Sequence, residues 1–420
     1  MKLFKKNTEL SFILKACFAV FITYLSMYAF RKPFTAAQYN NISLWGVDYK
    51  ILLIITQLIG YTISKYFGIK IISELTPSKR TITLIVLMAV SWISLLFFGL
   101  VPAPYNLPFI FLNGLPLGMI WGVVFSYIEG RRHTELLGVA MASSFIISSG
   151  IVKGVGSYLL INLQVPEMWM PFLTGLIFIP VLFLGVYLLH SLNQPNEDDI
   201  NARTERLPMN LLERKTFFRR FTPGIIFSVL IYVSLTVFRD LRDNFAVEFW
   251  NSIGMKNIPT MLVVSEVPIA ILVVIIIGSM IFIKNNKNAF FINFFIVFIG
   301  GLLLLLSTLL FYNKIITPTF WMIIVGFSMY LPYIAFHALF FERWIAYFKI
   351  KSNIGFLMYV ADAAGYLGST LVLLFKNFNN TNYSWVSFFT FSAIVTSVII
   401  IVLTSANYVY FKKQDKLQLV

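Results

Sequence analysis

Three kinds of residue are scarce in this chain: cysteine, histidine and charged residues. Among 420 residues there is one cysteine, Cys17, and there are three histidines far apart from one another. A single thiol excludes an intrachain disulfide framework, and isolated histidines do not form the clusters that bind metal ions. Charged residues make up 12% of the chain, about half of their share in ordinary globular domains. A disulfide scaffold, a metalloprotein and a soluble domain are therefore disfavoured.

The short motifs of common enzyme classes are also missing. The chain has no glycine-rich phosphate-binding loop, no serine motif of the nucleophile-elbow type and no helix with two spaced zinc-binding histidines. Each of those motifs exists because the chemistry needs a nucleophile, a metal or a phosphate cradle in a fixed geometry. We therefore expect a protein that is not an enzyme and that uses no cofactor or metal.

Apolar residues, by contrast, are abundant. They make up 58% of the chain, and the mean hydropathy is +0.81, which is typical of membrane proteins. Long apolar segments centre on the ranges 12–36, 50–68, 81–101, 107–128, 136–161, 169–190, 223–246, 259–283, 289–312, 317–341, 354–375 and 385–410. This pattern predicts an all-α polytopic membrane protein with about twelve transmembrane helices.

A polar stretch divides these segments into two groups of six. Between 193 and 221 the chain is rich in asparagine, proline, acidic residues and arginine, and charge-mixed segments of this kind are poorly ordered. We predict an N-terminal six-helix half (1–192), a cytoplasmic linker (193–221) and a C-terminal six-helix half (222–420).

The formal net charge of +15 is a topology signal. The basic residues fall mainly on alternate connections between the apolar segments, and such connections face the cytoplasm under the positive-inside rule. This places both termini in the cytoplasm, in a plasma membrane or a bacterial inner membrane, and we expect no nucleic-acid partner. A basic, then apolar N-terminus also resembles a secretory signal, but this stretch carries half of an internal repeat, so we favour a retained first helix.

The internal repeat is the most informative feature. Tyr24-Leu-Ser-Met-Tyr-Ala-Phe-Arg31 and Tyr232-Val-Ser-Leu-Thr-Val-Phe-Arg239 share their tyrosine, serine, phenylalanine and arginine positions. The apolar run before each arginine is shorter than the ~20 residues that span a bilayer. We therefore expect both helices to continue past their arginines, which places both guanidinium groups at membrane depth. An ionisable group there costs about 2.5–3.5 kcal/mol and should face a cavity or a partner.

The repeat also places polar side chains on one stripe of each helix, at 100° per residue. The stripes comprise Tyr24, Tyr28, Arg31 and Thr35 in the first helix, and Tyr232, Thr236, Arg239 and Asp243 in the seventh. A polar stripe on a spanning helix should face the protein interior, so its tyrosines, arginines and Thr236 are candidate substrate ligands. Lys32 and Arg242 lie off the stripes, and we expect lesser roles for them.

Further ionisable residues lie within other apolar segments: Lys65, Lys153, Glu266, His337 and Asp362. We count Lys153 among the candidate substrate ligands and the other four, with Asp243, among candidates for coupling or ion pairs. An unpaired buried carboxylate is costly. We therefore expect Glu266 and Asp362 to lie within reach of Lys153, of the two arginines of the repeat, or of each other.

Structural interpretations of the arginines stay open at this point. Long basic side chains at helix ends can extend to the membrane interface, and both Arg31 and Arg239 could do so. Arg239 could also form an ion pair with Asp243, which lies one helical turn later. Either interpretation removes the need for an anionic ligand at these positions.

The other ionisable residues have structural interpretations as well. Glu266 and Asp362 could each neutralise a basic neighbour and do nothing else, with Lys153 as the partner of Asp362. His337 could be a hydrogen-bonded packing residue instead of a proton relay. The sequence does not choose between these interpretations and a role in transport.

Six plus six helices with cytoplasmic termini, a central linker and repeated halves resemble the major facilitator fold, which binds its cargo between the halves. Within it, the chain resembles the organophosphate:phosphate antiporter family. The similar motifs are Tyr28-Ala-Phe-Arg31-Lys-Pro-Phe34, Tyr61-Thr-Ile-Ser-Lys65-Tyr66, Arg239, Glu266-Val-Pro268 and Gly365-Tyr-Leu-Gly-Ser369. The chain departs from that family after the second helix, where Lys65-Tyr-Phe-Gly-Ile-Lys70 stands, and in the fifth, which has no histidine. It also resembles an uncharacterised bacterial family related to these carriers.

The resemblance implies that Arg31 and Arg239 grip the phosphate group of a cargo. We therefore expect a monomeric secondary transporter in the lipid bilayer that moves a small anionic, phosphorylated metabolite, in exchange for inorganic phosphate, with its first and seventh helices adjacent across a central cavity. Two alternatives stay open. If Glu266 or Asp362 titrates, proton-coupled symport of another solute is the better interpretation, and a transporter-like sensor of such an anion is the other.

Overall fold

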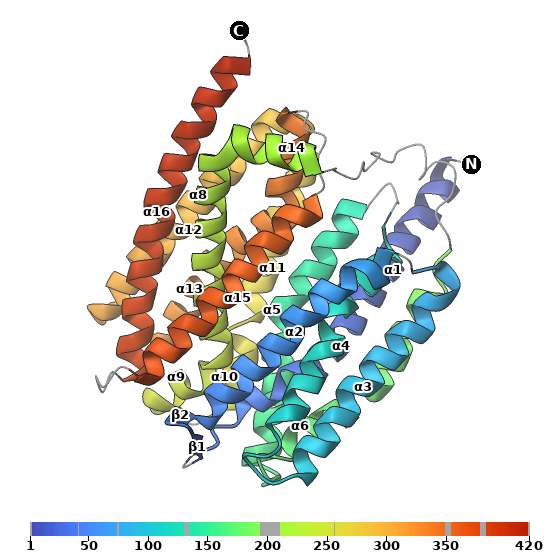
Figure 1. The fold of residues 1–420 in the computed structure, drawn as a ribbon, viewed down its shortest axis with the longest axis vertical. Helices are drawn as coiled ribbons and strands as arrows, with labels where there is room; N and C mark the ends of the chain where they lie inside the picture. The colour runs from blue at the N-terminus through green and yellow to red at the C-terminus, as the bar shows by residue number, and fades with distance from the viewer. Residues whose placement is uncertain are drawn as a thin grey trace. The chain divides into compact units, whose positions relative to one another are not determined.

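The computed structural model describes residues 2–40, 42–73, 75–129, 134–193, 211–255, 257–348, 354–378 and 384–418. Contacts between Cα atoms divide the chain into two compact units. The first comprises Met1–Arg203, Met255–Val264 and Asn377–Asn379, and the second comprises Thr204–Gly254, Ser265–Lys376 and Asn380–Val420. The described part of each unit is almost entirely helical (Figure 1).

The elements of the first unit are α1 (Lys2–Arg31), β1 (Ser43–Leu44), β2 (Val47–Asp48), α2 (Tyr49–Ser73), α3 (Arg80–Leu100), α4 (Leu107–Phe125), α5 (Thr134–Ile161), α6 (Met170–His190) and α10 (Ile258–Val264). Two 3₁₀ turns, Pro33–Ala36 and Pro77–Lys79, follow α1 and α2. The two short strands pair antiparallel.

The elements of the second unit are α8 (Leu211–Asn244), α9 (Ala246–Ser252), α11 (Val267–Ser279), α12 (Asn286–Tyr312), α13 (Pro318–Ala335), α14 (Phe341–Phe348), α15 (Ile354–Phe378) and α16 (Trp385–Gln418). A 3₁₀ turn, Met280–Phe282, ends α11, and a π-helical turn, Phe336–Phe340, joins α13 to α14.

Most of these helices are long enough to span a membrane. Within the described ranges, ten stretches are long and apolar enough to cross a bilayer. The helices α2 and α15 are 25 residues each, which also exceeds the ~20 residues that a span needs. The predicted all-α polytopic membrane protein is confirmed, and the predicted apolar segments match the helices closely.

The first arginine of the repeat lies at a helix end, so the prediction that both helices continue past their arginines is wrong for Arg31. The helix α1 ends at Arg31, whereas α8 continues past Arg239 to Asn244. The physical reason is Pro33, which has no N–H to continue the helical hydrogen bonds and whose ring clashes with the carbonyl four residues earlier; a 3₁₀ turn begins there instead. The helix gains its spanning length at the other end, since it already starts at Lys2.

The eighth apolar segment is broken near its middle. The helix α10 ends at Val264 and α11 begins at Val267, with Ser265 and Glu266 between them. Proline has no N–H, and its ring clashes with the carbonyl four residues earlier. For Pro268 that carbonyl belongs to Val264, the last residue of α10. The break is therefore explained by the sequence Glu266-Val-Pro268.

Part of the stretch 193–221, expected to be a poorly ordered linker, is helical. The helix α8 begins at Leu211 and bends at Phe221, whose φ of −118° and ψ of 18° lie outside the helical range, two residues before Pro223. Residues 194–210 lie outside the described part of the chain. The predicted boundaries of the two halves stay a prediction.

In the first unit, glycines bring α4 into close contact with α2. Gly114 and Gly118 of α4 lie so near the backbone oxygens of Gln57 and Tyr61 that a Cβ at either position would overlap them. Small residues at a spacing of four allow such close approach between membrane helices. This contact fixes the backbone of α2 at two residues that lie beside the end of α1.

In the second unit, α8, α12, α14 and α16 pack around a cluster of aromatic rings. Phe411 of α16 lies 4.8 Å from the ring of Trp344 and 5.0 Å from the ring of Phe290. Edge-to-face contacts of this kind add to the effect of apolar burial. Beside them, the side-chain amide of Asn407 donates to the hydroxyl of Ser228 over 2.9 Å and joins α16 to α8.

Candidate functional site

The end of α1 is held by side-chain amides from two other helices. The last carbonyl groups of a helix have no partner within the helix. Here Asn113 of α4 donates to the Phe30 carbonyl over 2.9 Å, and Gln57 of α2 donates to the Arg31 carbonyl over the same distance. Asn113 also donates to the hydroxyl of Ser91 on α3 and accepts from Gln57. Three other helices, α2, α3 and α4, therefore position the end of α1.

The guanidinium of Arg31 lies over an aromatic ring. Its Cζ atom is 4.1 Å from the ring centroid of Tyr61 and 5.9 Å from that of Tyr28. The ammonium nitrogen of Lys65 is 5.2 Å from the same Tyr61 ring. A cation within about 6 Å of a ring face is attracted by the ring quadrupole. Two cations thus share one tyrosine, and we call Arg31, Tyr61, Lys65 and Tyr28 the Arg31 site.

The tyrosines of the first stripe pack into an aromatic group. Tyr24 and Tyr28 are both buried. The ring of Phe145 on α5 lies 5.0 Å from Tyr24 and 6.2 Å from Tyr28. Their side chains point to the interior of the first unit, as the stripe predicts. Their contact with a substrate stays a prediction.

Buried lysines accompany the Arg31 site in the first unit. Lys153 of α5 is 2% exposed, Lys32 is 7% exposed and Lys50 is 4% exposed. The ammonium of Lys50 donates to the carbonyl of Thr35 over 2.7 Å, so it fixes the turn that follows α1. Burial of Lys32 shows that its position off the stripe does not place it in solvent. The role of Lys153 as a substrate ligand stays a prediction.

The second arginine of the repeat is bound to its neighbour in the chain. Nε and Nη2 of Arg239 donate to Oδ1 of Asp240 over 3.1 and 2.7 Å. The other oxygen of Asp240 accepts from Ser369 of α15 over 2.8 Å. The Cζ atom of Arg239 lies 4.4 Å from the ring centroid of Tyr333 on α13. We call Arg239, Asp240, Ser369 and Tyr333 the Arg239 site.

An ion pair between Arg239 and Asp243, one turn later, was one interpretation left open by the sequence, and the structure pairs Arg239 with Asp240 instead. Asp243 is buried. Helical spacing favours i,i+4 pairs, but here Ser369 and Tyr333 on neighbouring helices hold the two side chains together. Asp240 was missed because it lies off the polar stripe. Its place next to Arg239 was the only signal in the sequence.

A hydrogen-bonded chain of side chains lies beside this site. The Tyr232 hydroxyl donates to Oδ1 of Asp362 over 2.6 Å, and its oxygen is 3.1 Å from the Tyr333 hydroxyl. All three side chains are buried. Asp362 therefore accepts a hydrogen bond from a tyrosine of α8, whose hydroxyl in turn contacts that of a tyrosine on α13 of the same unit. Tyr232, a candidate substrate ligand, is therefore bonded to Asp362, a candidate coupling residue.

Thr236 faces a helix contact. A Cβ added to Gly365 of α15 would lie 2.9–3.0 Å from three Thr236 side-chain atoms. Thr236 is 1% exposed, and its hydroxyl oxygen has no hydrogen-bond partner among the described residues. Its position supports close packing of α15 on α8, and its contact with a substrate stays a prediction.

The partner of Glu266 is Arg242, which the sequence analysis had given a lesser role. Nη1 of Arg242 donates to Oε1 of Glu266 over 2.6 Å, and Nη2 donates to the carbonyl of Met322 over 3.2 Å. The two side chains are 1% and 7% exposed. The expectation that Glu266 pairs with Lys153 or an arginine of the repeat is corrected. Gly326 leaves room for the guanidinium, because a Cβ there would lie 2.8 Å from Nη2.

Two expectations lie outside what the structure tests. The side chain of His337, in the π-helical turn, lies outside the described residues. The expected juxtaposition of Arg31 and Arg239 concerns different units and stays a prediction. In the described part of the chain, no group of three or more His, Cys, Asp and Glu residues is arranged to hold a metal ion.

Solved structures with a similar fold are membrane transporters. The nucleoside transporter NupG matches with a TM-score of 0.63 and 14% identity, over 96% of this chain and 99% of that one. A bacterial homologue of the human lysosomal transporter Spinster, in an inward-facing and unoccupied conformation, matches with a TM-score of 0.59 and 11% identity, over 95% and 96%. At such identities the likeness shows the fold alone, which is the predicted major facilitator fold.

Sequence comparison adds the family. No curated protein matches the chain in sequence. A family model described as "Family of unknown function (DUF5690)" matches residues 33–414. This match includes Arg239 and every other candidate residue except those in α1. The match covers most of the chain, and the chain therefore belongs to the DUF5690 family.

Proposed function

We propose that the protein is a secondary transporter of a small anionic, phosphorylated metabolite, which it moves across the bacterial inner membrane by alternating access. The observation that carries the proposal is the Arg31 site, where the guanidinium of Arg31 and the ammonium of Lys65 lie over one tyrosine ring. The major facilitator fold supports transport. Both termini lie in the cytoplasm under this proposal, as the distribution of basic residues favours.

The chemistry of the Arg31 site suits a phosphate group. An arginine offers a rigid planar fork that binds two oxygens of a phosphate at once, and charge-assisted bonds of this kind are the strong ones. Stacking on Tyr61 restrains the plane of the guanidinium, while its N–H edge remains the part that bonds. Lys65 adds a second positive charge beside the same ring. The amides of Gln57 and Asn113 keep the backbone of Arg31 in place.

Arg239 acts as a second ligand in this proposal, with a condition that Arg31 does not share. Because Nε and Nη2 bond to Asp240, an anion at Arg239 must use the remaining N–H groups or displace the carboxylate. Action of the two arginines on one anion is the prediction made from the repeat. The resemblance to the organophosphate:phosphate antiporters supports it and suggests inorganic phosphate as the exchanged anion.

Exchange follows from the cost of desolvation. A cationic site that loses its water without an anion is unfavourable, since buried charge needs a partner. A bound oxyanion supplies that partner, so the loaded transporter changes conformation more readily than the empty one. Such a transporter exchanges anions and resists leak.

The proposal is tested with proteoliposomes loaded with inorganic phosphate and given labelled sugar phosphates outside. We expect counterflow with wild-type protein and a loss of about tenfold or more in Arg31→Lys, because lysine is a point charge without the fork. Lys65→Arg is the matched control, since it keeps a cation on the same ring, and it should retain most activity. Normal counterflow in Arg31→Lys would contradict the proposal and favour simple extension of Arg31 to the interface.

One observation favours a second candidate function, proton-coupled symport. Asp362 is buried and accepts a hydrogen bond from Tyr232, which lies beside the Tyr333 hydroxyl, and such chains can carry protons. Under this alternative, an imposed proton gradient drives uptake in the wild type, and Asp362→Asn abolishes that response. Uptake that ignores the gradient in both proteins would exclude it.

A further inference from the structure

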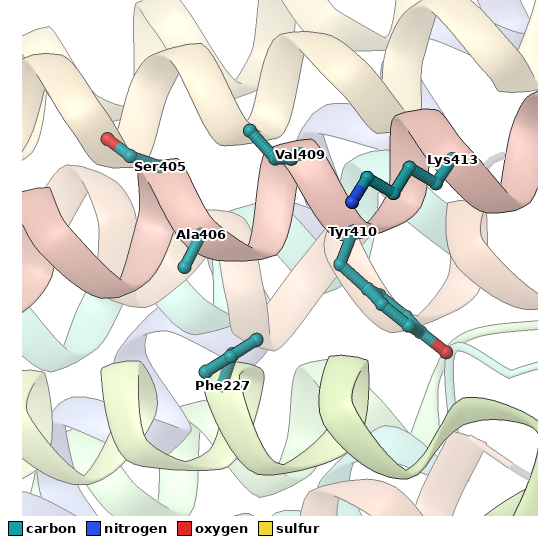
Figure 2. A pocket seen from close by; sticks show the side chains of 6 residues that line it. All are labelled: Phe227, Ser405, Ala406, Val409, Tyr410 and Lys413. Atoms are coloured by element: carbon teal, nitrogen blue, oxygen red, sulfur yellow. The ribbon is translucent and has the colours of Figure 1, made fainter.

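An open groove lies on the second unit between α8 and α16. It has a volume of about 460 Å³ and is lined by Phe227, Ser405, Ala406, Val409, Tyr410 and Lys413, within the range of about 300–1,000 Å³ for small-ligand sites. In Figure 2, Ala406 and Tyr410 both point from α16 toward α8, Ala406 lies nearest to Phe227, and the Lys413 side chain runs back along α16 toward Tyr410. No candidate residue of the transport site lies in this groove.

The groove lies next to a packed contact between α8 and α16. Asn407 bonds to Ser228 in the buried part of the contact. Gly224 allows the rings of Phe411 and Tyr410 to approach α8, since a Cβ there would lie 2.6 and 2.9 Å from them. Beyond Gly224 toward the start of α8, the helix bends at Phe221. The groove lies beside this contact and is lined by residues of both helices.

One end of the groove is apolar and the other is cationic. Phe227, Ala406 and Val409 form the apolar part, whereas Lys413 is exposed at the other end. The Tyr410 hydroxyl donates to the backbone carbonyl of Arg220 over 3.1 Å, which brings the start of α8 to this end. Further exposed basic side chains at the same ends of α8 and α16 are Arg219, Arg220 and Lys416.

We propose that this groove binds one anionic glycerophospholipid, with an acyl chain along Phe227, Ala406 and Val409 and the phosphate of the headgroup at Lys413. The lining faces outward from membrane-spanning helices, so lipid is the solvent that meets it. Basic clusters at the ends of spanning helices attract anionic headgroups. Tyr410 lies between the apolar and cationic parts, where amphipathic rings are favoured in membranes.

The occupant is an anionic lipid and not a zwitterionic one because of this charge pattern. Among the described residues that line the groove, Lys413 is the only charged one. A zwitterionic headgroup brings its own ammonium to the cationic end, which cancels the gain. An acyl chain alone would bind without regard to the headgroup. Headgroup selectivity is therefore the property that separates the proposal from ordinary lipid contact.

The test is native mass spectrometry of the full chain in detergent, titrated with dioleoylphosphatidylglycerol or dioleoylphosphatidylcholine. We expect the wild type to bind the first phosphatidylglycerol more tightly than phosphatidylcholine. Lys413→Glu should weaken phosphatidylglycerol binding by about fivefold or more and leave phosphatidylcholine unchanged. Lys412→Glu is the matched control, because it makes the same charge change one residue away, but the Lys412 ammonium lies 4.7 Å from the ring of Phe291 on α12. It should shift affinity by less than about twofold.

A second variant tests the apolar part of the groove. Ala406→Trp places a large ring in the groove beside Phe227 and should weaken the binding of both lipids. Lys413→Gln gives a milder change in case the charge reversal lowers the folding yield. The proposal is overturned by equal affinity for the two lipids, or by equal effects of Lys413→Glu and Lys412→Glu. It is also overturned if Ala406→Trp abolishes a dimer instead of lipid binding, which would make a second copy of the chain the occupant.

Discussion

The two copies of the repeat place equivalent arginines in different chemical surroundings. In the Arg31 site, neutral amides hold the backbone of the arginine, and its guanidinium rests on Tyr61. In the Arg239 site, the guanidinium rests on a tyrosine as well, Tyr333, but a carboxylate binds it directly. Stacking on tyrosine is thus the shared feature. The two sites differ in the groups that restrain the arginine, which are neutral amides on the backbone in the Arg31 site and a carboxylate on the guanidinium in the Arg239 site.

The two units also differ in the sign of their buried charged side chains. Among the described residues of the first unit, the charged side chains classed as buried are all lysines: Lys32, Lys50 and Lys153. In the second unit they are one arginine and five carboxylates: Arg242, Asp243, Glu248, Glu266, Asp362 and Asp415. A unit with buried cations favours an anionic ligand, whereas a unit with buried carboxylates balances its own cations or holds protons. Under the proposed function, anion recognition therefore rests mainly on the first unit and internal pairing on the second.

The largest expected effect comes from breaking the internal pairing of the second unit. Arg242→Met leaves Glu266 buried without its partner and should lower the free energy of unfolding by about 3–5 kcal/mol. Glu266→Leu added to it should restore most of that loss, because an apolar pair replaces a buried ion pair at little cost. Unfolding in mixed micelles followed by circular dichroism measures both. A double variant as unstable as Arg242→Met would show that Glu266 contributes little to the effect.

An intermediate effect is expected from the neutral network of the first unit. Asn113→Ala removes the donor to the Phe30 carbonyl and the partner of Gln57, and unsatisfied buried groups cost about 1–3 kcal/mol. Because the end of α1 loosens, anion-induced thermal stabilisation should also fall. Asn293→Ala is the matched control, since that buried asparagine donates only within its own helix, to Ala289. Equal losses in both variants would argue against a positioning role for Asn113.

The smallest expected effect concerns Asp240. Asp240→Asn removes the negative charge from Arg239, so an anion no longer competes with a carboxylate there. We expect inorganic phosphate to raise the melting temperature at about two- to fivefold lower concentrations than in the wild type, because exposed or half-buried pairs contribute about 0.2–1 kcal/mol. Ser369→Ala, which removes the bond to Asp240, should act in the same direction but less. A weaker phosphate response would mean that Asp240 positions Arg239 for the anion.

Most of the fold could be predicted from the sequence, and the exceptions have local causes. The apolar segments predicted the helices because a bilayer requires ~20 apolar residues per span. The first helix was predicted to continue past Arg31, although Pro33 in the sequence indicates that it ends there. The break between α10 and α11 was also missed, and its signal was Pro268 four residues after Val264. In both cases hydropathy averaged over a long window predicted a continuous helix, whereas a proline ends or interrupts the helix locally.

The partners of the ionisable residues could not be predicted in the same way. Glu266 meets Arg242 because Gly326 of α13 leaves room for the guanidinium. Arg239 meets Asp240 because Ser369 of α15 and Tyr333 of α13 hold them. These contacts depend on neighbours far away in the sequence. Helical spacing, the only guide available from the sequence, pointed to Asp243 instead.

The sequence by itself determined that this is a helical membrane protein with a repeated arginine on a polar stripe, because hydropathy and periodicity are properties of consecutive residues. Only the tertiary structure decided that two amides hold the carbonyls of Phe30 and Arg31, that Arg239 binds Asp240, and that Glu266 binds Arg242. The physical reason is the cost of burying charge. Each buried cation or carboxylate takes the nearest partner that helix packing provides, and packing is set by residues on several helices at once.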